Sequence, residues 1–194
     1  MRRSIALAVV TLTCVGLAAP PAQAAAQVSV AEFAFSPATI IVPQGEDVAW
    51  HDGGTRQHTS TGDGPLSLWD TGRISPGATS SSVDFLAAGT YPYHCSVHPF
   101  MHGTVRVPIV VSPRTGTKRT TFTVHLAAGG QTGFTYDVQK RKGPGAWTTW
   151  RTGVTTTSVR FHGGNGTFSF RSRLHRTANA ATSGWSPAAK IRVR

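Results

Sequence analysis

Four side chains suited to binding a soft metal occur in the first half of the chain. Cys95, His98 and Met101 follow one another at intervals of three residues, and His58 lies upstream of them. Two imidazoles and a thiolate, with a weaker thioether at longer range, form the ligand set of blue-copper electron-transfer centres. These residue types therefore predict a copper site. Zinc also accepts Cys and His ligands, and the thioether of Met101 is the feature that favours copper.

The first 24 residues have the composition of a secretory signal peptide. A basic start, Arg2 and Arg3, precedes an apolar run over 5–19 and a small-residue cleavage site at 22–24. The apolar run is shorter than the roughly 20 residues that span a bilayer, so we expect no transmembrane segment. The mature protein is expected to be secreted or held in the cell envelope.

Removal of that leader leaves Cys95 as the single cysteine of the mature chain, because Cys14 lies within the leader. A free thiol outside the cell is open to oxidation unless something occupies it. A buried, inert cysteine is the alternative. The neighbouring His98 favours a metal ligand.

The elements that must position these ligands are predicted to be β-strands throughout. Runs rich in β-branched and aromatic residues alternate with Gly- and Pro-containing turns, and no segment has helical periodicity. Strands are expected at 28–35, 39–42, 47–50, 80–85, 89–93 and 103–111, and then at 120–126, 134–140, 146–151, 158–162, 167–174 and 189–193. Short strands at this spacing predict β-sandwiches.

Charge divides the chain into two parts. Residues 27–113 carry three cations and seven acids, a net charge of −4, whereas residues 114–194 carry 14 cations and one acid, a net charge of +13. This contrast predicts two domains with different partners, a copper domain at 27–113 and a second domain at 114–194.

The first part, over about 27–111, resembles the cupredoxins of the plastocyanin and amicyanin branch, and Cys95-x-x-His98-x-x-Met101 has the short spacing of amicyanin. The matching segments are Phe33 to Ile40, the Val42-Pro43-Gln44-Gly45 turn, Val48 to Trp50, Trp69 to Gly72, and Gly89 to Cys95. The resemblance implies a Greek-key β-sandwich that holds one type 1 copper through His58, Cys95, His98 and Met101 at one end. It also implies a single-electron carrier rather than an enzyme.

Residues around the expected ligands have predicted roles of their own. Many cupredoxins have an Asn two residues after the tryptophan, which ties the ligand loops together; Asp52 stands there, and its negative charge would lower the reduction potential. His94 is expected to point away from the metal, because strand side chains alternate, and His102 to lie at the rim. Pro99 and Phe100 are expected to form an apolar patch for a transient redox partner.

The second part resembles a fibronectin type III domain over roughly 116–194, which implies an immunoglobulin-like sandwich. The matching segments are Phe134 to Arg141, Trp147 with Trp150, Thr167 to Arg173, and Ser183 to Pro187. Phe168 stands where this fold usually has a tyrosine with a hydrogen-bonding hydroxyl.

The basic charge of this second part predicts an anionic cell-envelope polymer or an acidic protein as its partner, unless the charge is only a solvated surface. Nucleic acid is not expected, since there is no recognition helix and no basic stripe interleaved with aromatic residues.

Two other functions remain open at this point. The protein could bind copper for trafficking or resistance, or it could be an adhesion module of the envelope. Against trafficking, the mature chain has one cysteine and one methionine, so no array of sulfur ligands is available to pass Cu(I) along.

Overall fold

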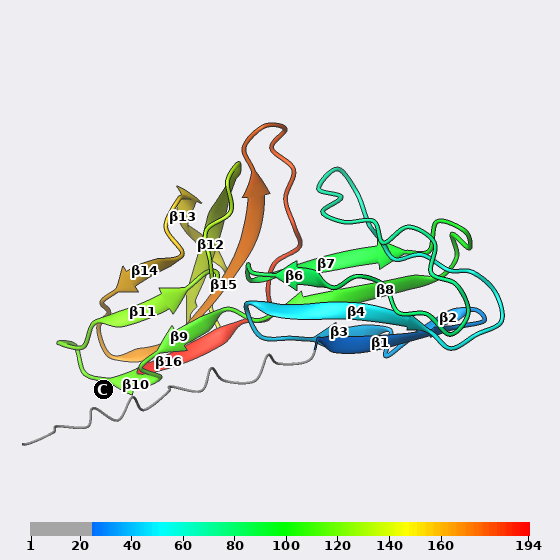
Figure 1. The fold of residues 1–194 in the computed structure, drawn as a ribbon. Helices are drawn as coiled ribbons and strands as arrows, with labels where there is room; N and C mark the ends of the chain where they lie inside the picture. Colours follow the sequence, from blue (N-terminus) through cyan, green and yellow to red (C-terminus); the bar gives the residue numbers. More distant parts are fainter. Residues whose placement is uncertain (1–24) are drawn as a thin grey trace, which may run out of the picture.

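The computed structural model describes residues 25–194, and its regular elements are all β-strands (Figure 1). The expected all-β fold class with two sandwiches is confirmed. Within the described range no helix is long and apolar enough to cross a membrane. The expected signal peptide, residues 1–24, lies outside that range.

Two four-stranded sheets form the first sandwich. The strand order of one sheet is β2 (Ala34–Ser36), β1 (Ala26–Ala31), β4 (Glu46–Asp52), β6 (Val83–Phe85). The order of the other is β3 (Thr39–Ile41), β8 (His102–Val107), β7 (Gly89–His94), β5 (Thr61–Gly62). Buried side chains alternate with more exposed ones along β1, β7 and β8, as expected for sheets with one buried face. At the centre, the ring of Trp50 stacks on Trp69 at 5.9 Å and meets Tyr93 edge-on at 5.4 Å.

The second sandwich packs a five-stranded sheet against a three-stranded one. The five-stranded sheet has the order β10 (Thr115–Gly116), β16 (Ala189–Val193), β15 (Gly166–Arg176), β12 (Phe134–Lys142), β13 (Thr148–Val154). The three-stranded sheet has the order β14 (Ser158–Phe161), β11 (Phe122–His125), β9 (Val110–Ser112). Phe161 is central to the core, with its ring 5.0 Å from Phe170 and 4.9 Å from Phe168. A second β domain is therefore present, and its fibronectin type III character stays a prediction.

One expected strand is divided between the two sandwiches. The sequence predicts a single strand over 103–111, and the inward side chains do alternate without a break from Val105 to Val111. The structure ends β8 at Val107 and begins β9 at Val110, on a sheet of the other sandwich. Pro108 lies in the gap, and because it has no N–H it cannot continue a hydrogen-bonded ladder.

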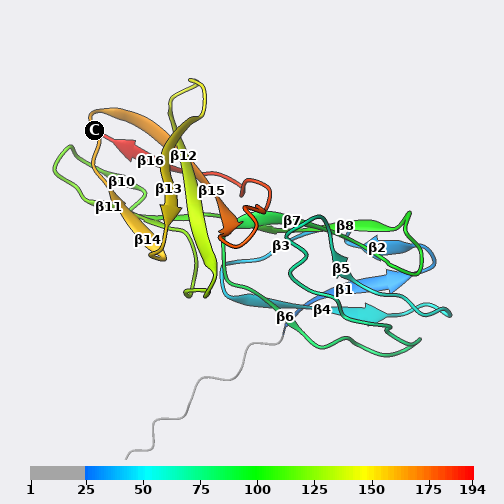
Figure 2. The ribbon, with the colours of Figure 1, turned by 90° about the horizontal axis from the view of Figure 1, so that it is seen from above.

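Backbone and side-chain hydrogen bonds join the two sandwiches end to end (Figures 1 and 2). Thr90 and Gly184 exchange N–H···O bonds of 3.0 and 2.9 Å across the junction. The side-chain amide of Gln44 donates to the carbonyls of Pro108 and His125 at 3.1 and 3.0 Å. The second sandwich thus lies at the Gly89 end of β7, and the opposite end of β7 leads into the loop that carries the cysteine.

Candidate metal centre

Three of the four expected ligands lie in the loop that joins β7 to β8. Tyr91 and Tyr93 point inward along β7, and Cys95 continues this alternation into the interior. The loop closes on itself, since the N–H of Cys95 donates to the carbonyl of Met101 at 3.1 Å and that of Met101 to His98 at 2.9 Å. This closure holds the three side chains at one end of the sandwich.

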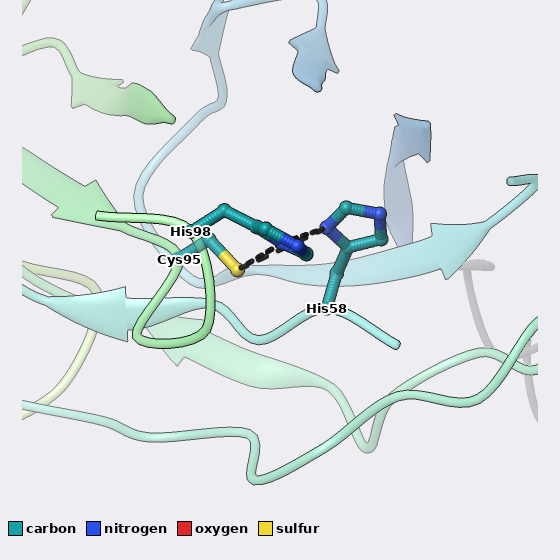
Figure 3. Close-up of side chains that lie close together, drawn as sticks. All are labelled: His58, Cys95 and His98. Atoms are coloured by element: carbon teal, nitrogen blue, oxygen red, sulfur yellow. Dashed lines mark hydrogen bonds between the residues drawn. The ribbon is translucent and has the colours of Figure 1, made fainter. Parts of the chain in front are cut away.

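His58 reaches the same place from a different segment. Its backbone pairs with Ile74 in both directions, at 3.1 and 2.7 Å, which fixes the segment against the strand-like stretch beside it. The His58 and Cys95 side chains are completely buried, and His98 is half-buried. Figure 3 shows both imidazoles and the thiol converging.

The converging atoms form a nearly equilateral triangle. The Cys95 Sγ lies 3.9 Å from Nδ1 of His58 and 3.7 Å from Nδ1 of His98, and the two Nδ1 atoms are 3.2 Å apart. The circle through these atoms has a radius of about 2.1 Å, which compares with Zn²⁺ bonds of about 2.0–2.1 Å to imidazole and about 2.3 Å to thiolate. A first-row metal ion fits between the three donors, and the softness of the set suits copper.

Burial of His58 favours the uncharged imidazole, the form that binds a metal cation. Desolvation lowers the pKa of His58, and the positive charge of a protonated His98 lowers it further, while the negative charges of Asp52 and Glu32 act in the opposite direction. A lowered pKa favours the neutral imidazole, which is the form that offers a ring nitrogen to a metal. Its Nε2 is buried without a hydrogen-bond partner among residues 25–194, so packing rather than a hydrogen bond holds that side of the ring.

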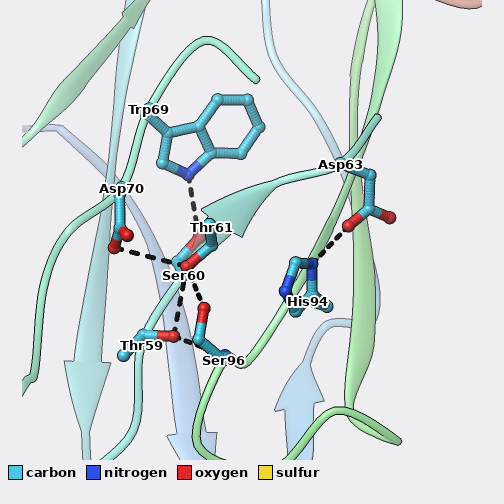
Figure 4. A network of polar contacts seen from close by, with 8 residues as sticks. All are labelled: Thr59, Ser60, Thr61, Asp63, Trp69, Asp70, His94 and Ser96. Atoms are coloured by element: carbon cyan, nitrogen blue, oxygen red, sulfur yellow. Dashed lines mark hydrogen bonds and ion pairs between the residues drawn. The ribbon is translucent and has the colours of Figure 1, made fainter. Parts of the chain in front are cut away.

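Thr59 connects the two ligand segments, a role that sequence reasoning missed. Its backbone N–H donates to the Cys95 Sγ at 3.3 Å, and its Oγ1 accepts the N–H of Ser96 at 2.7 Å. The Thr61 hydroxyl extends the network to Ser96 Oγ at 2.8 Å and to Asp70 at 3.3 Å (Figure 4). The only sequence signal for this role was that Thr59 adjoins His58.

Asp52, which stands where many cupredoxins have the loop-tying Asn, makes no hydrogen bond to the ligand loop among the described residues. It is completely buried, and its Oδ1 accepts the N–H of Gly54 at 3.0 Å, while Oδ2 has no partner in the described chain. Its influence on the site is electrostatic, through the pKa of His58. The expected effect on the reduction potential stays a prediction.

A comparison with known protein families matches residues 4–107, just over half the chain, to the cupredoxin-like domain. The chain belongs to the cupredoxin family. Its His-Cys-His group can hold one copper ion, the metal expected from the sequence.

Solved cupredoxin structures are also similar to this chain. Two amicyanin variants in the Cu(I) form are each 30% identical, with 44% of this chain and 84% of theirs covered at a TM-score of 0.40. A purple cupredoxin from Nitrosopumilus maritimus is 23% identical, with 42% and 98% covered, also at 0.40. No curated protein matches the chain.

Met101 is 2% exposed and ends the ligand loop of this cupredoxin. Its backbone carbonyl and N–H close the loop on Cys95 and His98. Its place in that closed loop agrees with the expected role as axial ligand, which stays a prediction.

The other two histidines near the centre lie outside it. Nδ1 of His94 pairs with Asp63 at 2.5 Å. The side chain of His102 is exposed, and its backbone pairs with His94 across β7 and β8.

A second aromatic residue, Phe33, lies beside the predicted docking patch. Its ring is 4.9 Å from His98 and 5.6 Å from Phe100, and the two phenylalanines are 46% and 67% exposed. Phe33 was missed as part of the site because it comes from the turn between β1 and β2, more than 60 positions from the ligand loop. Together Phe33, Phe100 and His98 form what we call the aromatic rim.

Proposed function

We propose that this cupredoxin is an exported blue copper protein that carries single electrons, with one type 1 copper held by His58, Cys95, His98 and Met101. The observation that carries the proposal is the triangle of two Nδ1 atoms and one Sγ, buried at the end of a sandwich in a domain of this family. A copper ion bound there supplies a one-electron Cu(II)/Cu(I) couple.

The surrounding residues hold the metal-binding atoms in place when a bound copper ion changes between Cu(II) and Cu(I). Cys95, His98 and Met101 are held by the loop's own hydrogen bonds, and His58 by its pairing with Ile74. The N–H of Thr59 stabilises a thiolate at Cys95 by donating to its sulfur. Ligands that do not rearrange on reduction keep the reorganisation energy of electron transfer low.

The aromatic rim supports a transient redox partner at this end of the molecule. Phe33 and Phe100 place exposed apolar surface beside His98, which is the ligand closest to solvent. Short-lived redox complexes bury small interfaces. We propose that the partner docks on this rim and that the electron passes through His98.

We propose export from the leader expected at residues 1–24. The test is the N-terminal sequence of the protein recovered outside the cytoplasm. A start near residue 25 supports export, and recovery of the uncleaved chain in the cytoplasm contradicts it.

The function is tested by adding Cu(II) to the purified mature protein and recording visible and electron paramagnetic resonance spectra through reduction and reoxidation. We expect one copper per chain and an intense thiolate-to-Cu(II) band that bleaches reversibly. Cys95→Ser removes the band, and Met101→Gln keeps copper but lowers the reduction potential, because a harder axial ligand favours Cu(II). A colourless Cu(II)-loaded protein, or unchanged colour in Cys95→Ser, overturns the proposal.

A further inference from the structure

A cavity of about 160 Å³ lies at the junction of the two sandwiches. From the first sandwich it is lined by residues 62–69, which follow β5, and by residues 90–92 of β7. From the second it is lined by residues 182–184, in the segment between β15 and β16. We call it the junction pocket. It is separate from the metal centre, because none of the four expected ligands lines it.

The lining of the junction pocket is mainly apolar. Its bulky apolar residues are Pro65, Leu66, Leu68, Trp69, Tyr91 and Pro92. Among residues 25–194, Asp63 is the only charged residue in the lining, and its carboxylate pairs with Nδ1 of His94. The pocket thus offers a ligand apolar surface, while the one charge beside it already has a partner.

Buried hydroxyl groups in the lining also have partners within the protein. Tyr91 donates to the backbone carbonyl of Ala87 at 2.7 Å. The Ser183 hydroxyl accepts the N–H of Leu174 and donates to the carbonyl of Gly184, both at 3.0 Å. A polar ligand would have to displace these hydrogen bonds, whereas an apolar one leaves them intact. The lining therefore favours an apolar ligand.

Hydrogen bonds between the sandwiches hold the two sides of the junction pocket together. Thr90 and Gly184, one on each side, exchange N–H···O bonds of 3.0 and 2.9 Å. The side chains of Arg176 and Asn179 donate to the carbonyl of Pro65 at 3.5 and 3.4 Å, which ties the loop after β5 to the second sandwich. Figure 1 shows this loop beside the segment between β15 and β16. The pocket is therefore formed before a ligand binds, as ligand sites at domain interfaces usually are.

We propose that the junction pocket binds an uncharged apolar molecule of about the size of a single aromatic ring. Apolar cavities of about 150 Å³ bind benzene, and the volume of this pocket is comparable. Trp69 and Tyr91 supply aromatic surface, against which a ligand ring can pack edge-on or offset. Burial of the ligand's apolar surface supplies the free energy of binding.

The surroundings of the junction pocket argue for a small molecule over a protein partner. The fully buried core of a protein interface is more apolar than the rest of the surface. The large exposed apolar side chains of residues 25–194 are Phe33, Ile41, Phe100 and Val110. None of these lines the junction pocket. Its apolar surface is therefore confined to the cavity, where a ring-sized molecule can reach it.

The junction pocket is connected to the metal centre through Trp69. The Nε1 of this residue donates to Oγ of Ser60 at 3.0 Å (Figure 4). Ser60 is two residues beyond His58, and the residue between them, Thr59, donates its backbone N–H to the Cys95 sulfur. The proposed ligand would therefore lie beside the hydrogen-bond network that supports the metal-binding cysteine.

The test is isothermal titration calorimetry of the full-length, copper-loaded protein with toluene and, as a charged molecule of similar size, with benzoate. Two separate variants, Thr182→Phe and Leu68→Phe, add a ring at half-buried positions of the lining. The matched control, Thr155→Phe, adds the same ring at an exposed position outside the lining. Thermal unfolding without ligand confirms that each variant is folded, and either pocket variant can serve alone if the other fails to fold.

We expect wild type and Thr155→Phe to bind toluene with a dissociation constant of about 1 mM or below. The two pocket variants should bind it roughly tenfold or more weakly, because the added ring fills the space that the ligand needs. Benzoate should bind roughly tenfold or more weakly than toluene, since its carboxylate would lose water without gaining a partner.

Four results each overturn the proposal. They are no binding of toluene to the wild type up to its solubility limit, unchanged binding in a folded pocket variant, an equal loss in Thr155→Phe, and binding of benzoate as tight as that of toluene. Calorimetry of toluene binding does not depend on the redox activity of copper, so failure here leaves the electron-carrier proposal standing.

Discussion

Thr59 acts on the metal centre twice, through its backbone and through its side chain. The N–H that donates to the Cys95 sulfur survives any substitution except proline. The Oγ1 that accepts the N–H of Ser96 is lost in alanine. The two contributions can therefore be separated by mutation.

We predict that Thr59→Ala lowers the free energy of unfolding by about 1 kcal/mol, because the N–H of Ser96 loses its acceptor in a part-buried hydrogen bond. Copper binding and the visible band should persist, since the four ligands and the N–H to sulfur remain. Urea unfolding of the metal-free protein measures the effect. Thr59→Ser keeps the hydroxyl and is the matched control; equal losses in the two variants would show that the methyl group, not the hydroxyl, is what matters.

The sequence predicts residues of the site only where they are close in the chain. Cys95, His98 and Met101 are recognisable by spacing, because a seven-residue loop brings them together without help from the rest of the fold. Phe33 reaches His98 only through the β1–β2 turn. No local pattern encodes that contact, so it had to come from the structure.

At the scale of elements, the turn between β1 and β2 is fastened to the loop after β4 by one carboxylate. Glu32 accepts the backbone N–H groups of Thr55 and Arg56 and the Thr55 hydroxyl. These hydrogen bonds, led by the Thr55 N–H, lower the pKa of Glu32 to about 2. The adjoining Phe33 belongs to the aromatic rim.

We predict a pH-dependent loss of stability in which Glu32 takes part. Because its folded-state pKa is lowered, its contribution is fully present above its ordinary value of 4.5 and is lost as the pH falls towards about 2. The difference in unfolding free energy between wild type and Glu32→Gln should therefore be largest at neutral pH and shrink between pH 4.5 and 2. Urea unfolding at several pH values tests this, with Glu46→Gln at the start of β4 as the control. A difference that is constant with pH contradicts the assignment.

The pairing of β7 with β8 depends on a glycine opposite an aromatic ring. Tyr93 pairs with Gly103, and a Cβ at Gly103 would overlap the Tyr93 ring. That ring cannot move aside easily, since it packs against Trp50 at 5.4 Å and Phe35 at 4.7 Å.

Gly103→Ala should accordingly destabilise the protein by about 1–3 kcal/mol, the usual cost of overpacking a core. It should also shift the visible band, because Gly103 lies two residues beyond Met101 on the same strand connection. Gly164→Ala is the control, since a Cβ there meets no atom within 4 Å. A stable Gly103→Ala protein with an unchanged spectrum would mean that the ring adapts.

Most strand positions followed from alternation and turn residues, although the single strand expected at 28–35 is wrong and is replaced by the antiparallel pair β1 and β2. The partners of the strands did not follow from these patterns. The unbroken alternation from Val105 to Val111 predicts one strand, and it persists because both halves bury the same face. The change of sheet at Pro108 depends on contacts with Gln44 and Pro187 that are distant in sequence. Short-range patterns carry no information about such pairings.

At the scale of the whole molecule, the two sandwiches share one continuous hydrophobic core. The N–H of Ala88 donates to the carbonyl of Leu126 at 2.8 Å and that of Ala128 to Leu86 at 2.9 Å, in addition to the Thr90–Gly184 pair. Opening this junction would break these hydrogen bonds and expose the apolar surface that the two sandwiches share. The structure therefore favours unfolding as one cooperative unit.

Copper bound at one end should consequently stabilise the sandwich at the other. At a free copper concentration of a thousand times Kd, mass action adds about 4 kcal/mol, which corresponds to a rise in Tm of about 8–16 °C for a chain of this length. Amide hydrogen exchange should show the same added protection in the core of β12 and β15 as in β7 and β8. Cys95→Ser should abolish the added protection throughout, and Gln44→Ala, which removes two hydrogen bonds across the junction, should reduce it in β12 and β15 alone. Protection that rises only in β7 and β8 of the wild type would show that the sandwiches unfold independently, with the junction too weak to couple them.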